Sequence, residues 1–428
     1  MFGVNNFMNT QKITIPQNWQ QIKIEKIFKV KSGQGFKANE YVPDGVRLLQ
    51  IENVGYGDVK WKKKNYLSEE YLKRYPELHL KEGDIVLALN RPVTNNRLKI
   101  ARLKKSDEPS ILYQRVGKII ANDDIVEKTY IYQISNIFLK KFVISQSIGS
   151  DQPYIAMKDL YNYKLILPPL PEQKRIVSIL ETWDNTIEKL SNKIKLKKQL
   201  KKGLMQKLLT GDVRLPGFSG VWIIVALGDI GNIRTSSVDK KSVEGEKEVK
   251  LLNYMDVYRR DNISQTDIFQ KVTANDNQII SSNLKKRDVL FTPSSETKID
   301  IGHSAVVMED LDKILFSYHL IRFRPNKDII NYKFSAYCFK GYKFYLELWK
   351  KSQGATRFTL SKEALEKSKI KIPKSQEEQK AIANILISVD KEINLLQQKL
   401  DEFKKQKKYL LNKLVTGEIR TPESINVK

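Results

Sequence analysis

Cysteine and histidine are scarce in this sequence. Among 428 residues Cys338 is the sole cysteine, so no disulfide can form within the chain, and such scarcity is typical of a reducing cytoplasm. The three histidines, His79, His303 and His319, lie far apart along the sequence. Because a zinc site needs several nitrogen and sulfur ligands close together, we expect no metal site. We expect a cytoplasmic protein.

Long hydrophobic runs are also missing. The best apolar stretch, Val221 to Leu227, is far shorter than the roughly 18–20 residues that cross a bilayer. Residues 1–10 lack the basic and then apolar pattern of a secretory signal peptide. We therefore expect no contact with a membrane.

Motifs of common enzyme classes are absent or incomplete. Gly33-Gln34-Gly35 lacks the third glycine of a dinucleotide loop, and no phosphate-binding G-x-x-x-x-G-K-[ST] loop occurs. The Asn/Asp-Pro-Pro-aromatic motif of amino-methyltransferases is missing, since Pro168-Pro169 lies between two leucines. One catalytic hypothesis stays open, because Asp288, Glu296 and Lys298 have a spacing found in metal-dependent nucleases. The sequence favours a chain without an active site.

Negative charge is in short supply. Lysine and arginine number 75 against 49 aspartates and glutamates, which gives a formal net charge of +26. An excess of this size favours a polyanionic partner, most often nucleic acid. A lysine-rich composition that reflects an AT-rich genome would give the same number.

In place of these motifs the sequence contains a duplication. Residues 172–214 begin with Glu-Gln-Lys and end with Thr-Gly-x-x-Arg, and residues 378–420 repeat this pattern 206 residues later without a gap. An ungapped repeat with matched ends indicates a duplicated structural unit. Weaker echoes flank it, such as Asp84-Ile85-Val86-Leu87 and Asp288-Val289-Leu290-Phe291. The two flanking domains are therefore predicted to share a fold.

Each copy has the apolar spacing of a long helix. Apolar residues recur in steps of four and three, the heptad pattern that keeps one stripe facing a partner helix, with interruptions at Lys197, Lys201 and Lys407. We expect each helix to end at a Thr-Gly pair whose glycine is a left-handed C-cap. Two amphipathic helices that each lie on their own domain are the alternative. The predicted seam consists of Ile176, Leu180, Trp183, Ile187, Leu190 and Ile194 in the first helix and of Ile382, Leu386, Val389, Ile393, Leu396, Leu400 and Phe403 in the second.

The chain order predicts how the helices pair. A helix of about 40 residues spans about 60 Å, whereas a domain of about 160 residues has a radius of gyration of about 15 Å. The ends of the intervening domain cannot lie a helix length apart, as parallel pairing would require. We predict an α+β protein with two mixed α/β domains, joined by two long antiparallel coiled-coil helices as a pseudo-two-fold internal repeat. The predicted bounds are 1–168 for the first domain, 169–214 for the central helix, 215–373 for the second domain, 374–420 for the C-terminal helix and 421–428 for a tail.

Local composition predicts elements inside the domains. Runs rich in β-branched and aromatic residues favour strands, namely Lys118–Ala121, Thr129–Ile134 and Ile314–Arg324. Helices are predicted over Lys140–Ser147 and Tyr332–Trp349.

Polar loops in each domain carry side chains suited to DNA. Arginine and lysine bind phosphates, while asparagine, glutamine and arginine can pair with base edges. Any one of them could instead be an ordinary polar surface residue. The candidates are Arg91, Asn95, Asn96, Arg97, Lys99, Gln114 and Arg115 in the first domain and Ser294, Ser295, Thr297, Lys298, Tyr318, His319 and Arg357 in the second.

These features together resemble the specificity (S) subunit of Type I restriction–modification systems. The resemblance covers nearly everything from Trp19 to Arg420, and the second copy departs from the pattern at Lys374-Ser375-Gln376-Glu377, where the first has Pro-Leu-Pro. Two target-recognition-domain subtypes are resembled, one in each half. The residues that carry the likeness are Pro168 to Ile176 and Leu208-Leu209-Thr210-Gly211 with their second copies, Arg91-Pro92 with Gln114-Arg115-Val116, and Asp288 to Phe291 with Ser294 to Thr297 and Phe316-Ser317.

The resemblance implies a subunit with no active site or cofactor of its own. Each target-recognition domain would read one half of a bipartite, asymmetric sequence in double-stranded DNA. The helices would set the spacing and dock two methyltransferase (M) subunits, which supply S-adenosylmethionine and adenine N6 methylation. Restriction (R) subunits with ATP- and Mg-dependent activities would join them. A basic coiled-coil scaffold that binds nucleic acid nonspecifically is the alternative.

Overall fold

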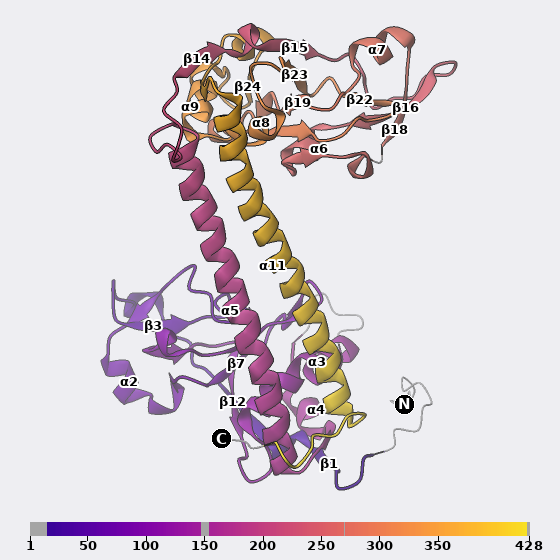
Figure 1. Cartoon of the computed structure of the whole chain (residues 1–428). Coiled ribbons are helices and arrows are strands. Elements are labelled where there is room, and N and C mark those ends of the chain that lie inside the picture. The colour runs from indigo at the N-terminus through magenta and orange to yellow at the C-terminus, as the bar shows by residue number, and fades with distance from the viewer. Residues whose placement is uncertain (1–14, 147–153, 269, 426–428) are drawn as a thin grey trace. The chain divides into compact units, whose positions relative to one another are not determined.

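The computed structural model describes residues 15–146, 154–268 and 270–425, and the last three residues of the predicted tail lie outside them. The chain forms two compact units, and many of their elements are labelled in Figure 1. Unit 1 comprises residues 1–189 and 400–428, and unit 2 comprises residues 190–399. Unit 2 is therefore continuous in sequence, whereas unit 1 is built from both ends of the chain.

Each unit contains a five-stranded sheet with the same topology. The order is β2-β12-β7-β10-β4 in unit 1 and β15-β23-β19-β21-β17 in unit 2. In both sheets the first four strands are antiparallel and the last pair is parallel. The strands are β2 Phe28–Ser32, β4 Tyr56–Gly57, β7 Ile85–Ala88, β10 Ile100–Arg102 and β12 Val116–Ala121, and then β15 Gly231–Thr235, β17 Asn262–Ile263, β19 Val289–Phe291, β21 Ser304–Val307 and β23 Ile321–Pro325.

A second sheet and a two-stranded pair repeat as well. The second sheet has the order β5-β3-β11-β6 in unit 1 and β18-β16-β22 in unit 2, with a parallel central pairing in both. An isolated bridge from Asn283 to Leu315 takes the place of β6 in unit 2. The strands are β1 Gln20–Lys23 paired with β13 Lys164–Leu167, β14 Trp222–Ala226 paired with β25 Lys369–Pro373, and β3 Val46–Leu49, β5 Tyr66–Leu67, β6 His79–Leu80, β11 Ser110–Leu112, β16 Lys247–Leu252, β18 Lys271–Ala274 and β22 Ile314–Phe316.

Further helices belong to each unit. In unit 1 they are α1 Ile24–Ile27, α2 Glu70–Arg74, α3 Lys128–Gln146 and α4 Met157–Asn162, and in unit 2 they are α6 Tyr254–Tyr258, α7 Asp276–Ser281, α8 Tyr332–Cys338, α9 Tyr342–Lys351 and α10 Lys362–Glu366. In the described part of the chain, no helix combines the length and apolarity that crossing a bilayer needs.

The central strand of each five-stranded sheet is buried on both faces. Ile85 and Leu87 of β7 belong to the core that includes α3 and the start of the first long helix, whereas Val86 belongs to the core of the smaller sheet. In β19, Val289 belongs to the core that includes α8 and the start of the second long helix, whereas Leu290 belongs to a second core on the other face. Because successive side chains of a strand point to opposite faces, the short apolar run after Asp84 or Asp288 suffices to hold two cores together.

Two long helices follow the two domains in sequence: α5 Leu170–Leu208 joins the first domain to the second, and α11 Gln376–Thr416 follows the second. The predicted glycine caps are confirmed, since Gly211 and Gly417 have left-handed φ values of 74° and 73°. The two turns also share a backbone bond, in which the amide of Val213 donates to the carbonyl of Lys207 at 3.3 Å and Ile419 repeats it 206 residues later.

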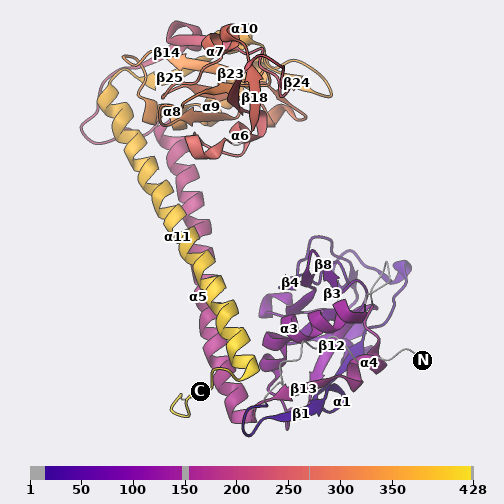
Figure 2. The ribbon, with the colours of Figure 1, turned by 90° about the vertical axis from the view of Figure 1, so that its right-hand side faces the viewer.

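The long helices pair antiparallel within each unit, as predicted (Figures 1 and 2). In unit 1 Trp183 packs edge-to-face on Phe403 with ring centroids 5.5 Å apart. Nearer the α5 N-terminus, Glu172 pairs with Arg420 beyond the α11 C-terminus. Unit 2 shows the same opposition by itself, since Lys197 contacts Glu392 whereas Lys201 contacts Asp390.

The predicted seam residues all lie on the covered side of the helices. Seven are buried, namely Ile176, Leu180, Ile194, Ile382, Leu386, Ile393 and Leu400. The other six are half-buried, namely Trp183, Ile187, Leu190, Val389, Leu396 and Phe403. The three lysines that interrupt the stripe form ion pairs with the opposite helix, Lys197 with Glu392, Lys201 with Asp390 and Lys407 with Asp184.

Several local predictions need correction. The predicted strand Thr129–Ile134 is wrong, because this segment opens helix α3 and buries Tyr130, Ile134, Phe138 and Phe142 at helical spacing. Burial against the sheet has overridden the strand propensity of its β-branched residues. The run Ile314–Arg324 is two strands, β22 and β23, and Tyr332–Trp349 is two helices, α8 and α9. Lys118–Ala121 lies in β12 as predicted, and Lys140–Gln146 ends α3, while Ser147 lies outside the described residues.

Candidate nucleic-acid interface

Three segments of unit 1 meet where β7 ends and β12 begins. The amide of Leu89, just after β7, donates to the carbonyl of Arg115 at 2.9 Å, and the amide of Ile155 donates to the carbonyl of Leu89 at 3.1 Å. The amide of Gln114 donates to the carbonyl of Gln34 at 3.0 Å. These bonds fix the loop after β7, the loop between β11 and β12 and the chain before α4 as one surface.

Unit 2 builds the same surface with two of these three bonds, because Pro293 has no N–H with which to repeat the bond from Leu89 to Arg115. The amide of Leu360 donates to the carbonyl of Pro293 at 2.8 Å, and the amide of Tyr318 donates to the carbonyl of Val238 at 3.1 Å. Each atom lies 204 or 205 residues after its counterpart in unit 1. Tyr318 and His319 therefore occupy the places that a glutamine and an arginine occupy in unit 1.

The surface of unit 1 gathers three of its predicted residues. Arg91, Gln114 and Arg115 are exposed there. Arg91 and Arg115 have left-handed φ values of 45° and 67°, a conformation that costs a non-glycine residue on the order of 1 kcal/mol. Strained, exposed arginines at a shared loop junction are suited to a ligand contact, because the neighbouring sheet imposes their geometry.

The other predicted residues of unit 1 belong to an adjoining hairpin. Strands β8 Val93–Thr94 and β9 Arg97–Leu98 are joined by Asn95 and Asn96, whose φ values are 50° and 56°. Two left-handed residues are what a tight two-residue hairpin turn requires, and asparagine tolerates them. Within this hairpin the Arg97 guanidinium lies 4.3 Å from the centre of the Tyr56 ring. Lys99 donates from Nζ to the carbonyl of Ile51 at 3.0 Å, so its charge is partly engaged.

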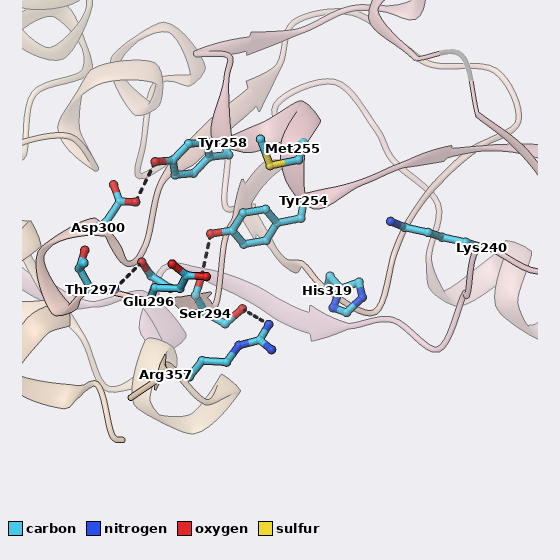
Figure 3. A pocket seen from close by; sticks show the side chains of 11 residues that line it. Lys240, Tyr254, Met255, Tyr258, Ser294, Glu296, Thr297, Asp300, His319 and Arg357 are labelled. Carbon is cyan, nitrogen blue, oxygen red and sulfur yellow. Dashed lines mark hydrogen bonds between the residues drawn. The ribbon is translucent and has the colours of Figure 1, made fainter. Parts of the chain in front are cut away.

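The surface of unit 2 is hollowed into a cavity of about 550 Å³ (Figure 3). Five predicted residues line it, Ser294, Ser295, Thr297, His319 and Arg357. The Tyr318 ring lies against the His319 ring with centroids 3.9 Å apart. Lys298 is exposed at the start of the 3-10 helix Lys298–Asp300 and is not part of the lining.

The sequence prediction missed the aromatic wall of this cavity. Tyr254 and Tyr258, four residues apart on α6, stack with centroids 5.8 Å apart, and Lys240, Met255, Glu296 and Asp300 also contribute to the lining. The spacing of the two tyrosines is a signal that the sequence did contain. Lys240 carried no such signal, because only the fold brings its loop to the cavity.

The cavity is electrostatically positive around His319. Burial lowers the pKa of His319, and nearby Lys240 and Arg357 lower it further, so the imidazole is neutral at neutral pH. Burial has the opposite effect on Tyr254, since it raises the pKa of the tyrosine hydroxyl. For Asp300, burial raises the pKa, but hydrogen bonds from His303 and Tyr258 outweigh it and leave the pKa lowered. Asp300 is therefore an ionised carboxylate whose oxygens are already engaged.

The nuclease hypothesis finds no support in the geometry of Asp288. This fully buried carboxylate accepts two hydrogen bonds of 2.7 Å from Arg324 and one of 2.8 Å from the amide of Lys285. It thus fixes the turn before β19, while Glu296 is exposed in the loop after it. Among the described residues, no three acidic, histidine or cysteine side chains are grouped as metal ligands.

The repeated Glu-Gln-Lys motif builds the joint between domain and helix in unit 1. Glu172 is buried and receives two hydrogen bonds from Arg420, at 2.7 and 2.8 Å, and one from Trp19 Nε1 at 3.0 Å. Its neighbour Gln173 donates to the carbonyls of Pro168 and Ile125. The motif therefore anchors the first strand, the helix start and the distant C-terminal arginine together.

Unit 2 repeats this joint with its own residues. Arg214 donates to both oxygens of Glu378, at 2.7 and 2.8 Å, and Trp222 Nε1 donates to the same carboxylate at 3.2 Å. Gln379 repeats the bonds of the first glutamine. In each unit the arginine that follows one long helix thus binds the glutamate that starts the other, which explains the matched ends of the repeat.

Comparison with known protein families identifies this arrangement. The family model of the Type I restriction modification DNA specificity domain matches residues 16–201 and again residues 220–405. The chain belongs to the Type I restriction–modification specificity (S) subunit family. The two matches correspond to the two copies of the repeat, each a domain followed by its long helix.

Curated relatives agree with this assignment, and a solved structure shares the fold. The specificity subunit of the Type I restriction enzyme MjaVIII from Methanocaldococcus jannaschii is 42% identical over 217 residues, which cover 50% of this chain and 51% of that protein. The EcoAI specificity subunit from Escherichia coli is 32% identical over 193 residues, 43% of this chain and 31% of that protein. The matched segments thus span about half or less of these relatives. A crystal structure of the Type I restriction–modification S subunit from M. genitalium has the same fold, with a TM-score of 0.54, 18% identity and coverage of 94% of this chain and 98% of that chain.

Proposed function

We propose that this chain selects the DNA sequence on which a Type I restriction–modification complex acts, and that it has no active site of its own. One observation carries this proposal. Both units present the same loop junction at the same end of the same sheet, yet with different side chains. Two surfaces with the same backbone arrangement but different side chains suit a bipartite, asymmetric target whose two halves differ in sequence.

Within each unit, the exposed residues of the junction are proposed to touch the DNA. Arg91 and Arg115 in unit 1 and Arg357 in unit 2 have the donors that pair with guanine or with phosphates. The net charge of +26 supports attraction to the DNA backbone. The predicted residues of the neighbouring hairpin would then contact phosphates beside the half-site.

The chemistry is proposed to reside on partner subunits. Two M subunits would dock on α5 and α11 and supply S-adenosylmethionine for adenine N6 methylation. R subunits would bring the ATP- and Mg-dependent activities. The paired helices would hold the spacing between the half-sites.

The decisive experiment produces the chain together with its M subunits in a methylation-free host and sequences the methylome. We expect methylated adenines in one bipartite motif with two unlike half-sites and a fixed gap. Equal affinity of the purified complex for all duplexes would instead favour a nonspecific basic scaffold. Mg-dependent cutting by the chain alone would favour the nuclease hypothesis.

A further inference from the structure

The cavity of unit 2 contains an arginine and a glutamate that form no ion pair with the other described residues. We infer that Arg357 and Glu296 together read one G·C base pair, Arg357 on the guanine and Glu296 on the cytosine. This inference rests on the proposed function, because it names what one half of the target contains.

Strand pairing places the two side chains opposite each other. Strand β20 Ser294–Ser295 pairs antiparallel with β24 Phe358–Thr359, so that Ser294 faces Thr359 and Ser295 faces Phe358. One step further along the same register, Glu296 faces Arg357. Because side chains alternate along a strand, both project to the face that Ser294 occupies. Arg357 indeed reaches the Ser294 hydroxyl at 3.4 Å, and all three residues line the cavity (Figure 3).

Both charges remain available to a ligand. Arg357 and Glu296 are exposed, and the ion pairs formed among the described residues include neither of them. The other acid of the cavity, Asp300, is already bound to His303 at 2.8 Å and to Tyr258 at 2.8 Å. An exposed carboxylate on a DNA-facing surface repels phosphates, so its presence is best explained by a hydrogen bond that it accepts from a base.

One G·C pair matches this arrangement from the major groove. The guanine presents two adjacent acceptors, N7 and O6, which suit the paired donors of arginine, and the cytosine presents an amino group that suits a carboxylate. An A·T pair offers an adenine acceptor beside a donor, so arginine cannot bind both positions. A phosphate would satisfy the arginine but would oppose the glutamate.

Tyr254 holds in place the backbone of β20, the strand that precedes Glu296. The Tyr254 hydroxyl donates to the carbonyl of Ser294 at 2.7 Å, and Tyr254 stacks on Tyr258. In unit 1 the bridge from Asn90 to Tyr154 corresponds to the pairing of Ser294 with Thr359, which places Pro92 where unit 2 has Glu296. The carboxylate is therefore a property of unit 2, and only that half-site should depend on a carboxylate that binds cytosine.

The test uses the complex with its M subunits and duplexes that carry the methylome motif. Replacing the G·C pair of the unit 2 half-site by A·T should weaken wild-type binding roughly 5- to 150-fold. Arg357→Lys keeps the charge but loses the paired donors, so it should remove most of that preference and become indifferent to 7-deazaguanine at that position. Glu296→Gln should lower the same preference while raising the affinity for unrelated DNA.

Two controls separate this inference from other effects. Lys298→Gln removes an exposed charge two residues from Glu296 and should weaken binding about equally on all sequences. Thermal unfolding should be unchanged in the three variants, since all three side chains are exposed. A clear bipartite motif with base preferences that Arg357→Lys and Glu296→Gln leave intact, or weaken uniformly, would overturn the inference alone. A wild-type complex without any sequence preference would overturn the proposed function as well.

Discussion

Arg115 occupies a backbone conformation that arginine adopts at a cost, which makes it a sharp test of function against stability. Its φ is 67° and its side chain is exposed. Asparagine tolerates this conformation better, so Arg115→Asn should leave the free energy of unfolding unchanged or slightly higher. We expect the same variant to relax base preference in the unit 1 half-site only, by about 1–3 kcal/mol for a base contact. Competition binding with duplexes altered in one half-site at a time measures this, and equal losses in both half-sites would indicate a phosphate contact.

The buried carboxylate of Glu172 gives a prediction for stability and its pH dependence. Burial raises its pKa, but the bonds from Arg420 and Trp19 outweigh burial and leave the pKa below the usual 4.5. A lowered pKa stabilises the fold above the unfolded-state value, and this contribution is lost as the pH falls through the folded-state value. Arg420→Gln should therefore destabilise unit 1 by on the order of 2 kcal/mol at neutral pH.

The difference between the Arg420→Gln variant and the wild type should shrink below pH 4.5. Denaturant unfolding at neutral and acidic pH, followed by the fluorescence of the tryptophans, measures this. Arg214→Gln is the matched variant for the joint of unit 2. If the difference in unfolding free energy between Arg420→Gln and the wild type stays constant across the pH range, this arginine does not hold the carboxylate ionised.

At the scale of elements, the lysines of the helix seam determine how α5 and α11 are aligned along each other. Lys201 and Lys407 interrupt the apolar stripe, yet each forms an ion pair across the seam, with Asp390 and Asp184. Polar groups at seam positions allow one alignment and oppose shifted ones. What the sequence presented as a break in the pattern is thus part of the pairing.

The helices also give a prediction for the DNA target. Inserting seven residues into both α5 and α11 preserves the heptad stripe and lengthens each helix by about 10 Å. At about 3.4 Å per base pair, the gap between half-sites should grow by about three base pairs, while the half-sites themselves stay the same. Methylome sequencing of the variant measures the gap directly. An unchanged gap would refute the role of the helices as spacer.

Individual elements show how far sequence patterns determine the fold. The seam was predictable because only a long helix keeps apolar residues on one face at steps of four and three over about 40 residues. The helix α3 was not, because its first residues, Thr129–Ile134, favour a strand locally and are helical only through burial against the sheet. The split of Tyr332–Trp349 into α8 and α9 falls at Gly341, the N-cap of α9, so the sequence did contain a local signal that the prediction missed.

At the scale of the whole molecule, the positive charge should make binding depend strongly on salt. Between about 50 and 200 mM salt, affinity should fall by several powers of ten, because bound lysines and arginines release counterions from the DNA. Lys298→Gln should reduce the slope of log affinity against log salt by about one if it contacts a phosphate, whereas Arg357→Gln should leave the slope nearly unchanged because Arg357 is proposed to bind a base. Fluorescence anisotropy with labelled duplexes measures both, and equal slopes in all variants would mean that neither residue binds a phosphate.

The candidate interface was only partly predictable, because the fold of the whole molecule brings distant segments of the chain together there. The predicted loops correspond in the two units, since Gln114-Arg115 and Tyr318-His319 occupy matching places, while their contact with DNA stays a prediction. The aromatic wall and Lys240 come from segments that lie far away in sequence, so their contribution depends on topology. Asn95 and Asn96 show the converse, because a turn requirement alone accounts for their identity.

The division of unit 1 between the two ends of the chain sets an order for biosynthesis. Unit 2 is continuous from Leu190 to Lys399, so all of its residues are translated before the last strip of unit 1. Unit 1 starts first, and Glu172 lacks its arginine partner until Arg420 is translated about 250 codons later. At about 5–20 residues per second, that delay amounts to tens of seconds at the slower rates. During this interval the nascent first domain has an open flank, and this is the stage at which chaperones would matter most for it.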